Sequence, residues 1–334
     1  MIKFLLVSNG GLAVVAKKFY EPCELKSKLI VFIDNHKAGS PTDPLVFWIH
    51  LKPREIASQF YEQTQHIVSN GTVKRLLKEL GYSYRKMSKT LATGIYAKRD
   101  EQFKIIMNII LAMSLKSPII SMDCKKKERL GNLYRDGKCL STDNIDVFDH
   151  DYDNLSEGKV IPHGIYDLQL NKGYISIGNC SETAEFITDN LRWWWTEYGI
   201  HSYPDAKNIL ILCDAGGGNS YRHHIFKLKL LELVKEIGVA IIITHYPPYS
   251  SKYNPIEHRL FCHVHHAIKG VVFSSYSLVK ELIQKTSTNK GLSVFVRLNL
   301  TQYQKGIPVG KNQIDTKRIF YTKKIPELSY KIIP

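Results

Sequence analysis

The chain has 334 residues, of which 44% are hydrophobic and 23% are charged, a composition typical of folded globular proteins and not of disordered ones. No stretch approaches the roughly 18 consecutive apolar residues of a membrane-spanning helix, and the short apolar run at the N-terminus has no small-residue cleavage site behind it. These features predict a cytoplasmic protein with no membrane partner and no signal peptide.

Basic residues exceed acidic ones, 46 to 31, which gives a formal net charge of +15. Such an excess favours a polyanionic partner, because lysine and arginine release condensed counterions when they neutralise phosphates. A basic soluble protein without such a partner is the alternative. The basic residues occur in three zones, 74–89, 125–127 and 311–331, which suggests several contacts along one extended ligand. The six cysteines show no metal or disulfide spacing, so we expect them to be reduced.

Residues 1–45 are the least regular part of the sequence. Helical patterning at 12–20 is followed by a strand-like run at 28–34 (KLIVFID) and a turn cluster at 39–44 (GSPTDP). We treat these residues as a separate N-terminal segment.

Residues 46–97 have the pattern of a helical DNA-binding domain. Apolar residues recur at helical spacing in 53–65, and a second helix runs from 70 to 80 before Gly81 ends it. The second helix carries Lys74, Arg75 and Lys78 opposite its apolar face. This pattern predicts a helix-turn-helix whose second helix enters the major groove. An ordinary helical hairpin with a solvated basic face is the alternative.

The remainder of the chain reads as a connector helix at 98–117, an α/β catalytic domain at 118–300 and a basic C-terminal tail at 301–334. Within the α/β domain we expect strands at 118–124, 131–135, 173–178, 208–214 and 239–245, and helices at 182–197, 221–237 and 254–269. This order predicts a mixed five-stranded sheet with helices on both faces. It is the order of the ribonuclease-H-like fold, although order alone does not select that fold.

Three acidic residues stand at the ends of these elements: Asp123 in the first strand, Asp214 after the fourth, and Glu257 in the first turn of the third helix. Taken singly, each has a structural interpretation, as a turn cap or as an acid at a helix N-terminus. Taken together they converge, because the first and fourth strands are neighbours in the expected sheet. Carboxylates without His or Cys suit Mg²⁺, with Mn²⁺ as a substitute. Two such ions about 4 Å apart would promote in-line phosphoryl displacement.

Successive blocks of the sequence resemble the Rhodopirellula-type DDE transposases of bacterial insertion sequences, in register from about Pro41 to about Val309. The blocks are SMDCKKKERLGN, IPHGIYDL, GYISIG, TAEFITDNLRWWW, CDAGGGNSYRHHIFKLKL, THYPPYSSKYNPIEHRLFCHV and GLSVFVRLNLTQYQKGIPV. PPYSSKYNPIEH is also similar to the block that carries the last acid in mariner-like transposases. The resemblance implies a ribonuclease-H-like catalytic domain with Asp123, Asp214 and Glu257 as its metal-binding triad.

The same resemblance implies a DNA substrate and suggests further contacts. We expect double-stranded DNA, both the ends of the insertion sequence and the target, bound at the nucleoid by a homodimer or higher oligomer, because two ends must be brought together. Lys125, Lys126 and Lys127 follow the first acid and are candidates to hold phosphate. His245, with Lys252, is expected to face the cleft and orient DNA; a buried histidine is the alternative.

The N-terminal segment departs from the family pattern. GGLAVVAK resembles the start of an additional helix-turn-helix, but KFYEPCELKSK replaces its continuation, so we interpret residues 1–45 as altered or truncated. The leading hypothesis is a transposase that cleaves and transfers DNA strands. One alternative is a degenerate copy that only binds DNA, against which the intact triad argues. The other is a ribonuclease-H-like nuclease, against which the helix-turn-helix argues.

Overall fold

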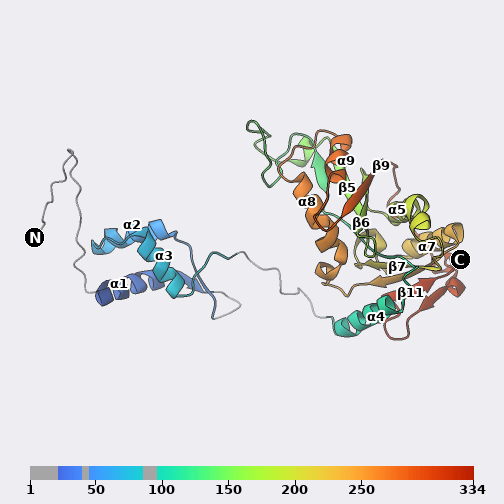
Figure 1. Ribbon diagram of the computed structural model, residues 1–334, viewed down its shortest axis with the longest axis horizontal. Coiled ribbons are helices and arrows are strands. Elements are labelled where there is room, and N and C mark those ends of the chain that lie inside the picture. The colour runs from blue at the N-terminus through green and yellow to red at the C-terminus, as the bar shows by residue number, and fades with distance from the viewer. Residues whose placement is uncertain (1–21, 40–44, 86–95) are drawn as a thin grey trace, which may run out of the picture. The chain divides into compact units, whose positions relative to one another are not determined.

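The computed structural model describes residues 22–39, 45–85 and 96–334 (Figure 1). The chain divides into two compact units, residues 1–90 and 91–334, which are described separately below. The helical pattern expected at 12–20 lies outside the described residues. Among the described helices, none is both long and apolar enough to cross a membrane.

The described residues of the first unit form three helices, α1 (Pro22–Asn35), α2 (Pro53–Thr64) and α3 (Asn70–Glu79), and a hairpin of β1 (Lys37–Gly39) and β2 (Phe47–Ile49). The two helices expected in this region are present. Ser69 caps α3 by accepting a hydrogen bond from the Thr72 amide at 3.0 Å. The apolar core draws on all three helices and includes Leu29, Phe32, Ile33, Ile56, Phe60, Val68, Val73 and Leu76.

The strand expected at 28–34 is wrong, because these residues belong to α1. Leu29, Phe32 and Ile33 have the i, i+3, i+4 spacing of one helical face, and all three are buried in the core shared with α2 and α3. The boundary placed at residue 46 therefore divides a single packed unit.

The described part of the second unit is built on a nine-stranded mixed sheet. Its strands are β3 (Ile119–Cys124), β4 (Glu128–Leu130), β5 (Gly158–Asp167), β6 (Lys172–Gly178), β7 (Asn208–Cys213), β8 (Ala240–His245), β9 (Ser293–Asn299), β10 (Ile319–Tyr321) and β11 (Ser329–Ile332). The order across the sheet is β10-β11-β8-β7-β3-β5-β6-β9, with β4 paired to β5. β7 runs parallel to both β3 and β8, whereas β3, β5 and β6 are antiparallel neighbours.

Four of the five expected strands are confirmed, as β3, β6, β7 and β8. The strand expected at 131–135 is wrong: Gly131 makes an isolated bridge to Phe273, and β5 takes the position beside β3. The sheet is also wider than the five strands expected. The residues interpreted as a C-terminal tail supply β10 and β11, and β11 pairs directly with β8.

Helices cover both faces of the sheet. They are α4 (Arg99–Ala112), α5 (Ala184–Trp194), the short α6 (Ile200–Ser202), α7 (His224–Ile237), α8 (Cys262–Ile268) and α9 (Tyr276–Gln284); π-helical turns occupy Trp195–Gly199 and Glu257–Phe261. Short 3-10 turns lie at Asp153–Leu155, Gly217–Asn219, Ser251–Tyr253, Lys311–Gln313 and Thr316–Arg318. In Figure 1, α5 and α7 lie on one side of the strands and α8 and α9 on the other.

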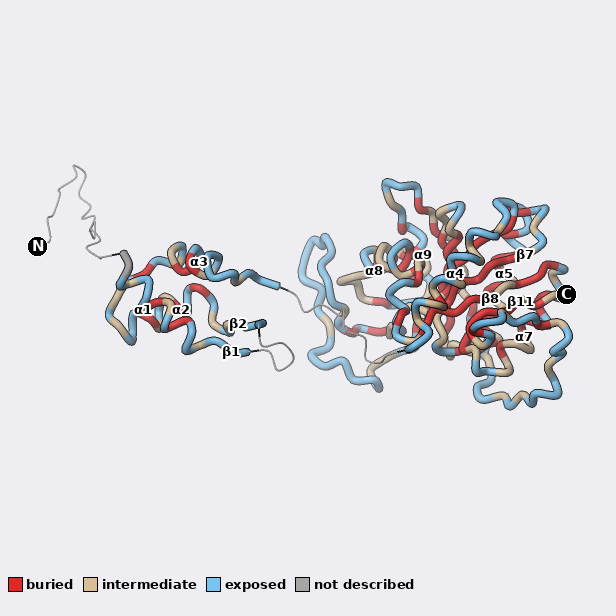
Figure 2. The backbone as a smooth tube through the Cα atoms, turned by 90° about the horizontal axis from the view of Figure 1, so that it is seen from below, coloured by how far each residue is buried: buried red, intermediate tan, exposed pale blue. Residues whose placement is uncertain are grey.

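Alternate residues of β7 pack into two different apolar clusters. Ile209 and Ile211 pack in the cluster with α5 and α7, whereas Leu210 and Leu212 pack in a cluster with Ile106 of α4. A strand buried on both faces needs a continuous apolar run, and NILILC supplies one. Figure 2 shows the resulting band of buried backbone through the central strands.

α4 is part of the second unit and not a free connector. Besides its apolar contacts, the buried Gln102 side chain donates hydrogen bonds to the His245 carbonyl at 2.8 Å and to the Ser329 hydroxyl at 3.0 Å. One amide group thus joins α4 to β8 and β11.

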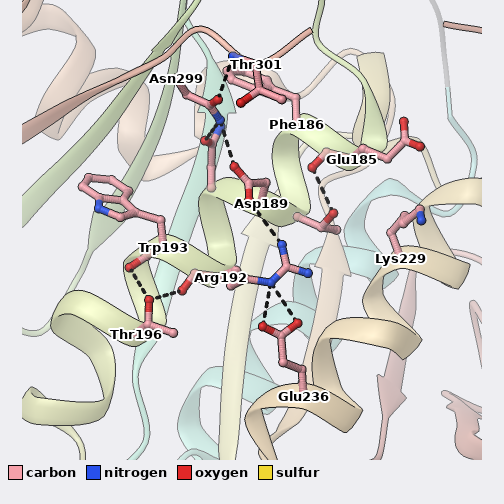
Figure 3. A network of polar contacts seen from close by, with 12 residues as sticks. Glu185, Phe186, Asp189, Arg192, Trp193, Thr196, Lys229, Glu236, Asn299 and Thr301 are labelled. Atoms are coloured by element: carbon pink, nitrogen blue, oxygen red, sulfur yellow. Dashed lines mark hydrogen bonds and ion pairs between the residues drawn. The ribbon is translucent and has the colours of Figure 1, made fainter. Parts of the chain in front are cut away.

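A polar network centred on Asp189 of α5 joins that helix to β9 (Figure 3). The Asp189 carboxylate accepts hydrogen bonds from Arg192 at 3.2 Å, from Arg297 at 3.0 Å and from Asn299 at 2.9 Å. Arg192 also pairs with Glu236 of α7, with its Nε 2.8 Å from both carboxylate oxygens. The network therefore connects three elements that lie far apart in the sequence.

Replacing Asp189 by alanine should lower the free energy of unfolding by roughly 2 kcal/mol, because it leaves the half-buried Arg297 without its carboxylate partner. Chemical denaturation of the two proteins measures the difference. Glu236→Ala is the matched control: it removes the more exposed half of the same network and should cost less than about 1 kcal/mol. Equal losses for the two variants would contradict a central role for Asp189.

Candidate active site

The parallel pairing of β3 and β7 brings two of the predicted acids together. Met122 is the register partner of Cys213, so the next residues along the two strands are Asp123 and Asp214. Both lie where the strands end, and both side chains are half-buried. Residues 91 positions apart in the sequence thus become neighbours, as the sequence predicted for the first and fourth strands.

A glycine-rich loop surrounds Asp214. The backbone N–H of Gly216 donates to Asp214 Oδ1 at 3.2 Å, and the Asn219 side-chain amide donates to the same oxygen at 3.3 Å. Asn219 is buried and also donates to the Asp214 carbonyl at 3.3 Å. These contacts fix the carboxylate at the strand end.

Glu257 is positioned by a buried hydrogen-bond network that begins in β3. Ser121, which is fully buried, donates to the Asn254 side chain and accepts from the Ile256 backbone N–H at 3.0 Å. The Asn254 amide donates in turn to the Met122 carbonyl at 3.1 Å. The start of the helical segment that carries Glu257 is therefore bonded to the strand that carries Asp123. Glu257 itself opens a π-helical turn, a feature frequent at functional sites.

The carboxylates act on one another electrostatically. Burial, followed by the negative charges of Asp214 and Glu257, raises the pKa of Asp123 to about 8, although a hydrogen bond from the Cys124 backbone N–H opposes the shift. All of these donors are oxygens, the type that Mg²⁺ and Mn²⁺ prefer, and a bound cation would relieve their repulsion. In the described residues, however, no three His, Cys, Asp or Glu side chains are grouped closely enough to hold a metal ion. The chemistry of these carboxylates thus fits a divalent cation. Of the three acids, the sheet makes direct neighbours of the two aspartates.

A cleft of about 350 Å³ opens beside Asp214. Its walls come from the glycine-rich loop and from the segment after β8, and include Tyr221, Arg222, Pro247, Pro248 and Tyr249. Tyr249 has a φ of 62°, a backbone conformation that side-chain-bearing residues rarely adopt. Asp214 is therefore accessible from solvent on this side.

The structure separates the predicted DNA contacts into two groups. Lys126, Lys127 and Lys252 are exposed, as are the three basic residues of α3, Lys74, Arg75 and Lys78. The Lys125 side chain is only 9% exposed and forms an ion pair with Glu128 at 3.2 Å. Lys126 and Lys127 are therefore the better placed of the three predicted phosphate contacts.

His245 does not face the cleft, so the DNA-orienting role predicted for it is wrong. Its side chain is 0% exposed, and its Nδ1 lies 2.9 Å from the Asp214 carbonyl oxygen. Burial lowers the pKa of this histidine to about 4, so it is neutral at physiological pH and donates from Nδ1. The alternative prediction, a buried histidine, is the correct one. The residue holds the backbone of Asp214 through the hydrogen bond to its carbonyl oxygen.

Two residues near the acids were missed by sequence reasoning. Ser121 carries a visible signal, since a hydroxyl inside the apolar run PIISM needs a buried partner. Glu182 itself gives only a weak signal, because an acid just before a helix is ordinarily explained by the helix dipole. The stronger signal is the run of glycines at 216–218, which lets another part of the chain approach the backbone closely.

The chain is similar to several solved structures and also matches one protein-family model. Among solved structures, a Mos1 transposase paired-end complex with left transposon end shares 16% identity over 81% of this chain and 74% of its own, with a TM-score of 0.44. A Mos1 paired-end complex with Mg gives 16% identity, the same coverages and a TM-score of 0.45. The catalytic domain of Mos1 gives 12% identity over 57% of this chain and 81% of its own, with a TM-score of 0.38. No curated protein matches the chain.

The family comparison is more specific. The model of the family described as "Rhodopirellula transposase DDE domain" matches residues 28–334, which include the aspartate pair, Glu257 and every strand of the large sheet. A match of that extent establishes membership: the chain belongs to the Rhodopirellula-type family of transposase DDE domains.

Proposed function

We propose that this protein is a metal-dependent transposase that cleaves and joins DNA strands at a site formed by Asp123, Asp214 and Glu257. The observation that carries the proposal is the β3–β7 pairing, which sets two carboxylates side by side at the carboxyl ends of two central strands, with a cleft beside Asp214. Family membership supports the same chemistry. The strand order β8-β7-β3-β5-β6, with β5 alone antiparallel to both of its neighbours, supports a ribonuclease-H-like core.

Asp123 and Asp214 would hold the divalent cation, with Glu257 as the third carboxylate, and Mg²⁺ or Mn²⁺ suits these donors. When bound, such ions activate the attacking oxygen and stabilise the leaving oxygen of an in-line phosphoryl displacement. The protein's own contribution is to hold the carboxylates: Gly216 and Asn219 fix Asp214, and Ser121 fixes the segment that carries Glu257. No side chain is assigned as an obligatory general base.

The exposed lysines near the aspartate pair would hold the DNA backbone. Lys126 and Lys127 lie three and four residues after Asp123, and Lys252 lies in the 3-10 turn before Glu257. Arg222 adds a further cation at the wall of the cleft. We propose that the substrate is double-stranded DNA, the ends of an insertion sequence together with a target, bound by a dimer or larger assembly at the nucleoid.

α3 would read the ends of the element. Replacing Lys74, Arg75 and Lys78 together by alanine should reduce the slope of log K against log salt concentration by about 2.7, the value for three lost phosphate contacts. Fluorescence anisotropy with labelled end DNA at several salt concentrations measures this slope.

The matched control removes the same charge from the second unit: Lys280, Lys285 and Lys290 replaced together by alanine. This variant should keep the slope of the parent protein. An equal reduction in both variants would show that the effect comes from net charge and not from α3.

The function is tested by incubating the protein with Mg²⁺ and labelled DNA that carries the sequences flanking its gene, beside the Asp214→Asn variant. We expect cleaved ends and joined products with the parent protein, and neither with Asp214→Asn. Cleavage without joining would indicate a nuclease, and binding without either reaction would indicate a protein that only binds DNA. Full cleavage by Asp214→Asn would overturn the assignment of the carboxylates.

A further inference from the structure

A fourth acid, Glu182, lies at the site and takes no part in the reaction described above. It precedes Thr183, the N-cap residue of α5, whose hydroxyl accepts from the Phe186 backbone N–H at 3.2 Å. The helix is therefore capped without Glu182. The acid is partly buried, and burial raises its pKa, an unfavourable position for a residue that only interacts with the helix dipole.

Glu182 lies directly against the glycine-rich loop. A Cβ atom added to Gly217 would lie 2.2 Å from Glu182 Oε1, and one added to Gly218 would lie 2.8 Å from the Glu182 carbonyl oxygen. The backbone N–H of Gly218 acts on the Glu182 carboxylate and lowers its pKa, which opposes the effect of burial. Gly217 also has a φ of +56°, so the loop needs glycine there for both space and conformation.

The same loop holds Asp214, because Gly216 and Asn219, on either side of these two glycines, donate to the Asp214 carboxylate. Glu182 also acts on β3 and the segment after it: its charge helps to raise the pKa of the Cys124 thiol, and the charge of Lys127 lowers the pKa of Glu182. Glu182 thus lies against the loop that holds Asp214 and interacts electrostatically with the segment that carries Asp123.

We propose that Glu182 is a positioning residue that fixes the Gly217–Gly218 segment and, through it, the orientation of Asp214 relative to Asp123. The proposal rests on the proposed function, since its purpose is to hold two metal-binding carboxylates in place. Residues that orient metal ligands in this way typically contribute about 10- to 100-fold to metal affinity or activity.

The first test compares Glu182→Ala with Glu182→Gln. Alanine removes the carboxylate that lies against Gly217, so we expect kcat for strand cleavage to fall by about 10- to 100-fold with an unchanged KM for DNA. Glutamine keeps an acceptor oxygen at the same reach and should stay within a few-fold of the parent. Glu185→Gln, which neutralises another acid at the start of α5, is the control and should leave kcat unchanged.

Direct Mn²⁺ binding, followed by electron paramagnetic resonance, gives a readout independent of turnover. Glu182→Ala should bind Mn²⁺ about 10-fold more weakly, and Glu182→Gln nearly as tightly as the parent. Loss of binding in Glu182→Gln equal to that in Glu182→Ala would overturn the proposal, because charge and not loop position would then be decisive.

A double-mutant cycle tests the contact itself. A methyl group at Gly217 would displace the Glu182 carboxylate, so Gly217→Ala should reproduce the kcat loss of Glu182→Ala, and the double variant should lose little more than either single variant. Gly238→Ala is the control for positive φ alone, since Gly238 has a φ of +70° with nothing within 4 Å of its added Cβ. Independent, multiplying effects would contradict the proposed contact.

The outcomes separate this inference from the proposed function. If Asp214→Asn is inactive while Glu182→Ala cleaves and binds Mn²⁺ like the parent, the function holds and the role of Glu182 is wrong. If Asp214→Asn cleaves normally, the function itself is wrong. Thermal unfolding of Glu182→Ala, measured alongside, verifies that both readouts come from folded protein.

Discussion

Asp123→Asn should lower the rate of strand cleavage by at least about 10³-fold and at the same time raise the unfolding temperature of the protein. The activity falls because the substitution removes an anionic oxygen beside Asp214, and metal ions in such sites lower the activation barrier by several kcal/mol. The stability rises because burial and the charges of Asp214 and Glu257 disfavour a carboxylate at this position, whereas a neutral amide of the same shape escapes the penalty.

Cleavage of labelled end DNA and thermal unfolding in metal-free buffer measure the two effects. Asp205→Asn is the matched control: this aspartate is exposed and paired with Lys116 at 2.8 Å, so neither activity nor the unfolding temperature should change much. A destabilised and inactive Asp123→Asn protein would indicate that the residue supports the fold instead of the chemistry.

Ser121→Ala should lower kcat by about 10- to 100-fold while leaving the affinity for DNA unchanged. The hydroxyl accepts from the Ile256 backbone N–H and donates to Asn254, so its removal leaves two buried groups without a partner at the start of the segment that carries Glu257. Each unsatisfied group costs about 1–3 kcal/mol, which favours displacement of that segment.

Steady-state cleavage kinetics and anisotropy separate the two quantities, at a temperature where the variant is folded. Ser117→Ala is the control, since Ser117 is also a buried serine and stands just before the same strand. A parallel loss in both variants would mean that any cavity near β3 impairs the protein and that Ser121 has no special relation to Glu257.

Two of the strands that sequence reasoning found have a nearly continuous apolar run, NILILC in β7 and AIIITH in β8. β5 was missed because Pro162, His163 and Gly164 interrupt its pattern. The histidine and glycine are tolerated because the strand lies in the centre of the sheet, where His163 is buried and Gly164 lets Phe261 approach. These are tertiary reasons, and they leave no local signal.

In α1 the sequence predicted a strand that the structure does not contain. A short run such as KLIVFID fits a buried strand or a buried helix equally well, and only the packing of Leu29, Phe32 and Ile33 against two other helices decides for the helix. The predictions for the candidate active site show the same limit of sequence reasoning. The aspartate pair followed from strand order, but the burial of His245 and the ion pair of Lys125 depend on neighbours distant in the sequence or on side-chain orientation.

The position of β11 limits how early during synthesis of the chain the large sheet can form completely. This strand follows all the other described strands in the sequence, yet it lies inside the sheet between β8 and β10, with Tyr330 buried and its ring 6.0 Å from that of His245. Chains emerge from the ribosome N-terminus first, so α1–α3 can fold while the sheet still lacks a neighbour for β8. The sheet of the second unit is therefore completed only after β11 has left the ribosome, and a nascent chain that meets DNA before then would do so with β8 unpaired on that side.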